Sequence, residues 1–112
     1  MPTQKDITIW RGNTETIPVE VKARVGATVA VVNLTGSTLH FRAEWVGGVI
    51  VKDLDIIDAP LGLAELRLTK AETRGVPQGA PALYEIERRV GTEEKTIAYG
   101  RLIASGGLNT DA

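Results

Sequence analysis

The clearest signal of the fold is the stretch Thr38-Leu39-His40-Phe41-Arg42-Ala43-Glu44-Trp45. Apolar and polar residues alternate along it, so one face carries Leu39, Phe41, Ala43 and Trp45 and the other carries Thr38, His40, Arg42 and Glu44. Successive side chains of a β-strand point to opposite faces of a sheet. The stretch is therefore predicted to be a strand with one buried face and one face in contact with water.

Strand signals continue on both sides of this stretch along the chain. They are rich in Val, Ile and Thr, whose β-branched side chains suit a pleated sheet. The expected bounds are 6–10, 15–22, 28–34, 49–54, 64–68, 82–90 and 94–104. Turn signals recur every 8–12 residues or so, a spacing typical of a β-sandwich or a small barrel.

Some strands carry more specific expectations. Pro18 lacks an N–H donor, which places its strand at the edge of a sheet or at a bulge. Val49 and Val51 are predicted to face the core. The segment 28–34 is apolar on both faces, as in a central strand or a joint between two sheets.

Other segments are expected to be loops or helix. A loop is predicted over 23–27, and 53–63 is the least regular part of the sequence. The segment 69–74 fits one helical turn, because Thr69 and Glu72 have the spacing of a capping box.

The pattern as a whole predicts an all-β fold. We expect a small antiparallel β-sandwich, immunoglobulin-like or barrel-like, with about eight strands and at most one short helical turn. A single domain is expected over 1–104, since domains are commonest at roughly 100–150 residues. The small and polar residues of 105–112 predict a flexible tail.

The composition excludes several kinds of function. Among 112 residues, 13 Lys and Arg stand against 14 Asp and Glu, so the basic surplus of a nucleic-acid-binding protein is missing. The absence of cysteine excludes disulfides, thiolate metal sites and cysteine nucleophiles. The single histidine, His40, excludes a multi-histidine metal site. We therefore expect no metal and no cofactor.

Export and membrane insertion are not expected either. The first residues are polar and are not followed by the apolar stretch of a secretory signal peptide. The longest mostly apolar run, near 27–34, is far shorter than the ~20 residues of a membrane helix. The sequence thus predicts a protein made in a cytoplasm, with no membrane contact.

Three groups of side chains are candidates for chemistry. Asp53, Asp55 and Asp58 share one predicted loop, but they lack the alternation and the closing glutamate of a calcium loop, which favours a solvated acidic connection. His40 could exchange a proton with Glu44 on the same strand face, although such a row is more typical of a wet sheet face or a polar interface rim. Trp10, at a strand end, is compatible with core, interface or sugar binding.

Four segments, in this order, resemble a known family. They are Asp6-Ile7-Thr8-Ile9-Trp10-Arg11-Gly12-Asn13, then Val32 to Phe41 with its Asn-Leu-Thr-Gly turn, then Leu66-Arg67-Leu68-Thr69 with Glu72-Thr73, and last Tyr84-Glu85-Ile86-Glu87-Arg88 with Tyr99-Gly100-Arg101-Leu102. The set is similar to the N-terminal domain of phage baseplate upper proteins and to related tail and head–tail proteins. Asn13 and Asn33 depart from it, because the family has Asp there.

The resemblance implies a structural protein and not an enzyme. Such a β-sandwich would pack against copies of itself and other virion proteins in a multi-copy ring at the tail, baseplate or head–tail junction. Its location would be the virion, assembled in the host cytoplasm. The residues expected at the interface are Trp10, Arg11, His40, Arg42, Glu44, Asp53, Asp55 and Asp58.

Two other functions stay open at this point. A capsid decoration protein would have the same fold but a copy number in the hundreds. A carbohydrate-binding module would use Trp10 and the wet face of the strand 38–45. An enzyme is the weakest interpretation, because no nucleophile, base and orienting group are matched in the sequence.

Overall fold

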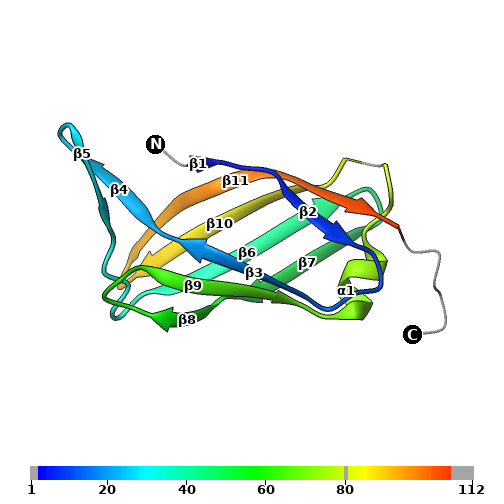
Figure 1. Ribbon diagram of the computed structural model, residues 1–112, viewed down its shortest axis with the longest axis horizontal. Coiled ribbons are helices and arrows are strands. Elements are labelled where there is room, and N and C mark those ends of the chain that lie inside the picture. Colours follow the sequence, from blue (N-terminus) through cyan, green and yellow to red (C-terminus); the bar gives the residue numbers. More distant parts are fainter. Residues whose placement is uncertain (1–2, 80, 107–112) are drawn as a thin grey trace.

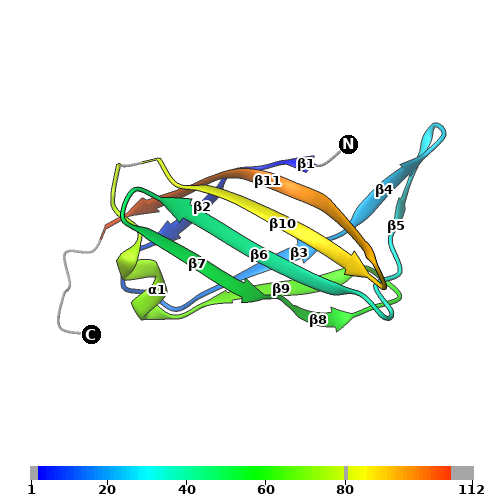
Figure 2. The ribbon, with the colours of Figure 1, turned by 180° about the vertical axis from the view of Figure 1, so that it is seen from behind.

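The computed structural model describes residues 3–79 and 81–106, which form a β-sandwich (Figures 1 and 2). Two sheets of unequal width face each other, and a two-stranded hairpin projects at one end. A short helix, α1 (Lys70–Gly75), lies at the other end. The predicted all-β sandwich is confirmed, with more strands than expected.

The larger sheet combines strands that are distant in the sequence. Its order is β1 (Thr3–Gln4), β11 (Glu93–Ser105), β10 (Leu83–Val90), β6 (Thr38–Trp45) and β7 (Gly48–Asp53), and β2 (Ile7–Trp10) also pairs with β11. The pairs from β7 to β11 are antiparallel. β1 and β2 instead run parallel to β11 and form the edge of this sheet.

The smaller sheet has the order β3 (Glu15–Glu20), β9 (Leu63–Leu68) and β8 (Asp55–Asp58), with antiparallel pairing throughout. The expected position of Pro18 is confirmed, because β3 is an edge strand. The N–H of Val21 donates to Gly62 O at 2.8 Å in the register that continues from β3. Hydrogen-bonded pairs alternate in an antiparallel ladder, so the nitrogen of Pro18 faces the open edge.

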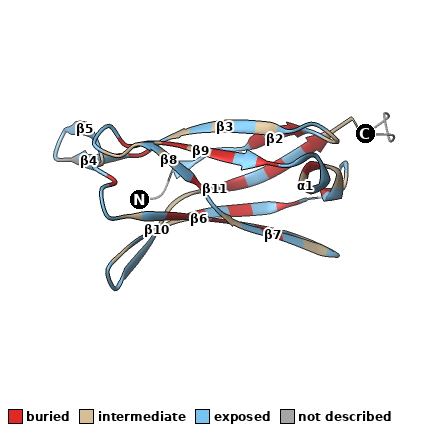
Figure 3. Cartoon of the chain, turned by 90° about the horizontal axis from the view of Figure 1, so that it is seen from below, coloured by how far each residue is buried: buried red, intermediate tan, exposed pale blue. Residues whose placement is uncertain are grey.

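The core fills the space between the two sheets (Figure 3). The larger sheet contributes the buried side chains of Ile7, Ile9, Leu39, Phe41, Ala43, Ile50, Tyr84, Ile86, Leu102 and Ala104, and the smaller sheet contributes those of Ala64, Leu66 and Leu68. The rings of Phe41 and Tyr84 stack with centroids 5.8 Å apart. Each fully buried large apolar side chain stabilises the fold by about 1.5–3 kcal/mol relative to an exposed one.

The edge formed by β1 and β2 is interrupted at Lys5 and Asp6. The carbonyl oxygen of Lys5 turns inward and accepts a hydrogen bond from the buried Tyr84 hydroxyl. The carboxylate of Asp6 replaces it as the acceptor for the N–H of Arg101, at 3.0 Å. Gly100 allows this close approach, since a Cβ at that position would lie 2.3 Å from the Lys5 carbonyl oxygen.

The helix α1 begins with the predicted capping box. Thr69 Oγ1 accepts from the Glu72 N–H at 3.2 Å, and Glu72 Oε1 accepts from the Thr69 N–H at 2.8 Å. Lys52 Nζ, from β7, also donates to Glu72 Oε1 at 2.7 Å. Burial alone would raise the pKa of Glu72, but the bonds from Lys52 and Thr69 outweigh burial and lower that pKa below its ordinary value.

One buried threonine attaches α1 to the rest of the sandwich. Thr73 is fully buried, and its hydroxyl accepts from the Gly12 N–H at 3.0 Å and donates to Asn13 O at 2.7 Å. The turn after β2 is thereby held against the helix. The capping box was predicted, whereas this contact between distant segments was not.

Three local predictions are wrong. Val49 and Val51 point outward, because Ile50 lies opposite Ala43 and takes the buried position. The segment 28–34 is not a central strand, since its first residues, with part of the predicted loop 23–27, form the exposed hairpin of β4 (Lys22–Val25) and β5 (Thr28–Val31). This hairpin connects β3 of the smaller sheet to β6 of the larger one, so the alternative of a joint between two sheets is the one that holds.

The acidic segment is also more ordered than predicted. Asp53 ends β7, whereas Asp55 and Asp58 are the first and last residues of β8. They therefore do not share a single loop. At the other end of the chain, the predicted flexible tail 105–112 begins too early, because Ser105 is the last residue of β11; residues 107–112 lie outside the described residues.

Candidate functional site

Four of the residues predicted at an interface lie on one surface of the larger sheet. The outward side chains of β7, β6, β10 and β11 form this surface, which we call the outer face. It carries Val49, Val51, Asp53, His40, Arg42, Glu44, Leu83, Glu85, Glu87, Arg89, Tyr99, Arg101 and Ile103. The alternate residues of the same strands are buried in the core, so the pleat itself turns these side chains away from it.

The strand register arranges the outer face in rows across the sheet. One row runs Val49, Glu44, Leu83, Arg101, and the next runs Val51, Arg42, Glu85, Tyr99. Neighbouring strands are about 4.8 Å apart, so the side chains within a row contact each other. Apolar and charged residues alternate in the first row, whereas in the second row Arg42 and Glu85 lie side by side between two apolar residues.

Most charges of the outer face are paired within it. Arg42 contacts Glu44 at 2.6 Å, and His40 Nδ1 contacts Asp53 Oδ1 at 2.8 Å. Exposed pairs of this kind contribute only about 0–1 kcal/mol to stability. They do, however, leave little net charge to prevent a second protein from approaching the face.

Two further pairs shift the pKa of their members. The hydrogen bond to Glu87, at 2.6 Å, raises the pKa of Arg89. The backbone N–H of Arg101 lowers the pKa of the Asp6 carboxyl, and the Arg101 guanidinium, 3.0 Å away, lowers it further. Glu85 differs from these residues, because no ion pair joins it to another side chain in the described part of the chain.

The apolar members of the outer face are open to solvent. Val49, Val51, Leu83, Tyr99 and Ile103 are between 37% and 63% exposed. Single exposed apolar residues are common on proteins, but a group on one sheet face is typical of a protein–protein contact. A second sheet or strand could cover this face while most of its charges stay paired within it.

Trp10 and Arg11 lie away from the outer face, near α1. Trp10 is 55% exposed as a whole residue. Its indole lies against Gly106, where an added Cβ would be 2.3 Å from the ring. Arg11 is half-buried, and its guanidinium donates to Arg74 O at 3.0 Å and to Gly106 O at 3.4 Å. These contacts attach the end of β11 to the helix.

The remaining aspartates belong to the smaller sheet. Asp58 accepts a hydrogen bond from the Leu61 N–H at 3.4 Å and so begins the turn into β9. Asp55 is exposed at the start of β8. Within residues 3–79 and 81–106, the acidic and histidine side chains do not gather into a group able to hold a metal ion.

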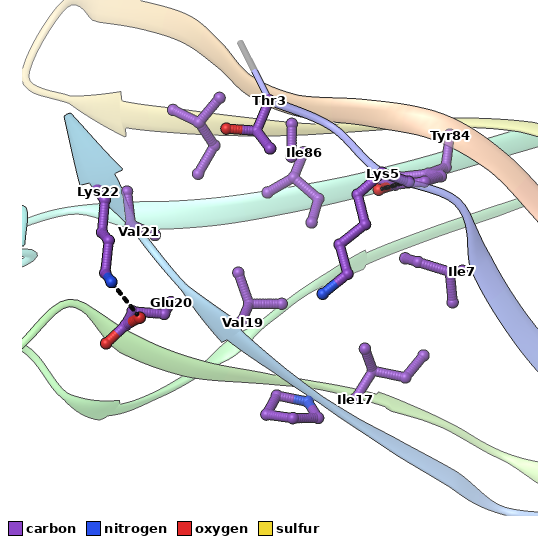
Figure 4. A pocket seen from close by; sticks show the side chains of 13 residues that line it. Thr3, Lys5, Ile7, Ile17, Val19, Glu20, Val21, Lys22, Tyr84 and Ile86 are labelled. Atoms are coloured by element: carbon purple, nitrogen blue, oxygen red, sulfur yellow. Dashed lines mark hydrogen bonds and ion pairs between the residues drawn. The ribbon is translucent and has the colours of Figure 1, made fainter. Parts of the chain in front are cut away.

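An apolar cavity of about 130 Å³ lies between the sheets, beside β1 and β3 (Figure 4). Ile17 and Val19 line it from the smaller sheet, and Ile86 lines it from the larger one. Lys5 reaches into this space, while Lys22 at the rim pairs with Glu20 at 3.0 Å. Small-molecule sites usually measure about 300–1,000 Å³, so this cavity is a gap in the packing at the open side of the sandwich.

Comparisons with known proteins add no relative. No protein-family model matches the chain, and no curated protein matches it. None of the described helical segments is long and apolar enough to cross a membrane. The geometry of the outer face is therefore the main structural argument for function.

Sequence reasoning identified only part of this face. The polar row His40, Arg42 and Glu44 was recognised from its alternation. Val49 and Val51 were assigned to the core, and Leu83 and Tyr99 were not singled out. The sequence did contain a signal for Leu83, because Tyr84 and Ile86 were predicted to point inward. Side chains alternate along a strand, so Leu83 and Glu85 must then point outward.

Proposed function

We propose that this chain is a structural subunit of a bacteriophage particle, placed at the tail, the baseplate or the head–tail junction. It assembles in several copies through protein–protein contacts, and the outer face is one of its contact surfaces. The observation that carries the proposal is the composition of that face, in which exposed apolar side chains lie beside charges that are mostly paired with one another. The phage assignment itself rests on the ordered set of sequence segments described above.

The size of the outer face is consistent with one contact of such an assembly. β6 and β10 are each eight residues long, which gives a length of about 27 Å, and four strands give a width of about 19 Å. The resulting area of ~500 Å² is smaller than the roughly 800 Å² that each partner buries in a stable interface. A contact made by the outer face alone would therefore be a weak one.

The other candidate functions receive less support from the geometry. A sugar-binding site at Trp10 would need an open ring face with polar groups beside it, and Gly106 covers one side of this indole. His40 and Asp53 form a hydrogen-bonded pair on a flat sheet face and do not line the cavity. A capsid decoration protein would use the same kind of contact, and its copy number in the particle would distinguish it from a tail protein.

Quantitative mass spectrometry of purified phage particles tests the proposal. We expect the chain in the particle at about three to twelve copies, the number set by closed symmetry of a tail ring. A count in the hundreds would indicate a capsid decoration protein. Absence from particles, with the chain present in the lysate of the same infected cells, would refute the proposed function.

A further inference from the structure

The hairpin of β4 and β5 projects from the sandwich and pairs with no other strand in the described part of the chain (Figures 1 and 2). Its register joins Lys22 to Val31 and Arg24 to Val29. The molecule measures 47 × 26 × 23 Å, and its radius of gyration is 14.8 Å. A compact domain of this length would have a radius of gyration of about 13 Å, so the hairpin lengthens the molecule noticeably.

The two sides of this hairpin, which we call the arm, differ in chemistry. Because side chains alternate along a strand and match across the register, one side carries Val29, Val31, Lys22 and Arg24. Val29 is 54% exposed and Val31 is 43% exposed. The opposite side carries the small residues Ala23 and Ala30. One side of the arm is thus both apolar and cationic.

An isolated two-stranded hairpin is marginally stable in water. Nothing in the described part of the chain covers the exposed valines of the arm. Backbone bonds hold only its base, where Val32 N–H donates to Val21 O at 2.9 Å and Val21 N–H donates to Gly62 O. A contact that covers Val29 and Val31 would remove this unfavourable exposure.

The outer face complements both the apolar and the cationic character of the arm. It offers exposed apolar residues, among them Val51 and Tyr99, and between these two lie Arg42, which pairs with Glu44, and Glu85. No ion pair joins Glu85 to another described residue, and the same is true of Arg24 on the arm. The apolar groups and the two opposite charges can therefore be satisfied together.

We propose that the arm of one copy docks on the outer face of the next copy, with Arg24 against Glu85 and Val29 against Val51. This inference rests on the proposed assembly function and names the surface that the outer face binds. The two surfaces are different, so the contact is head-to-tail, and repeated rotation can close it into a ring.

Two single variants test the contact by complementation, with light scattering after size exclusion as the measurement. Val29→Asp damages only the arm, and Val51→Asp damages only the outer face. Each variant alone should lose assembly, with affinity weakened about 30-fold or more. An equimolar mixture retains one intact arm and one intact face, so it should form a dimer of about 24 kDa, twice the 12.0 kDa of the chain.

A matched control and a charge exchange complete the experiment. Leu61 is 52% exposed on a different part of the surface, so Leu61→Asp should leave assembly unchanged. Arg24→Glu and Glu85→Lys should each weaken assembly, and the double variant should restore it. Circular dichroism verifies that every variant is folded.

The possible failures are distinguishable. A wild-type chain that stays at 12.0 kDa up to millimolar concentration would refute self-assembly and hence the inference. Wild-type assembly that survives Val29→Asp would refute the role of the arm and leave the proposed function standing. Two inactive single variants whose mixture forms no dimer would show that arm and outer face do not bind each other.

Discussion

Replacing Thr73 by valine removes one hydroxyl group and leaves the shape of the side chain almost unchanged. In the wild type this hydroxyl accepts from the Gly12 N–H at 3.0 Å and donates to Asn13 O at 2.7 Å. Valine can do neither, so two backbone groups between β2 and β3 lose their partners. The turn and α1 then lose the polar contact that holds them together.

The cost follows from the burial of these groups. A fully buried backbone group without a partner costs about 1–3 kcal/mol. Both bonds lie in partly buried positions, so the lower end applies and the total loss is about 2 kcal/mol. For 112 residues, each kcal/mol corresponds to about 4 °C, and the melting temperature should fall by about 8 °C.

Urea unfolding followed by tryptophan fluorescence measures this loss, and Thr73→Ser is the matched control. Serine keeps the hydroxyl and removes only one methyl group, at a cost of about 1 kcal/mol. We therefore expect Thr73→Val to be less stable than Thr73→Ser. If valine proves as stable as threonine, or more stable than serine, the hydroxyl does not hold α1 in place and the reasoning is refuted.

Other residues give predictions of the same kind. Glu72→Gln should cost about 1 kcal/mol at pH 7. Because the pKa of Glu72 is lowered on folding, the stability difference between the variant and the wild type should shrink as the pH falls below the ordinary value of 4.5. Urea titrations at pH 7 and pH 3.5 measure this difference, and a constant value would contradict the contact with Lys52. Gly100→Ala should cost about 1–3 kcal/mol, since its methyl group would overlap the Lys5 carbonyl oxygen; an unchanged melting curve would argue against that close approach. Ala98→Val should stabilise the fold by about 0.5–1 kcal/mol by filling part of the cavity beside β1, and a loss of stability would mean that the gap is already closed.

Regular alternation made the strand 38–45 predictable from sequence, and the capping-box spacing did the same for the pairing of Thr69 with Glu72. Both depend on neighbours along the chain, because a period of two fixes the faces of a strand and a capping box spans three residues. The fold class follows from the same local signals. The contact of Thr73 with the turn at Gly12 depends on tertiary packing, for which the sequence carries no local signal.

The outer face illustrates what local patterns leave undetermined. Val49, Ile50 and Val51 are all apolar, so alternation does not say which of them is buried. The choice is made by the hairpin register, which places Ile50 opposite Ala43. Composition likewise does not separate a strand buried on both faces from an exposed hairpin, which is why 28–34 was left as either a central strand or a joint between two sheets.

Hydroxyl-radical footprinting tests the central claim most directly, because it compares side-chain accessibility in the isolated chain and in purified particles. The account predicts that Leu83 and Tyr99, on the outer face, become protected in the particle. Leu61, at the turn between β8 and β9, should remain as reactive as in the isolated chain. Equal reactivity of Leu83 and Tyr99 in both states would contradict the assignment of the outer face as an assembly surface.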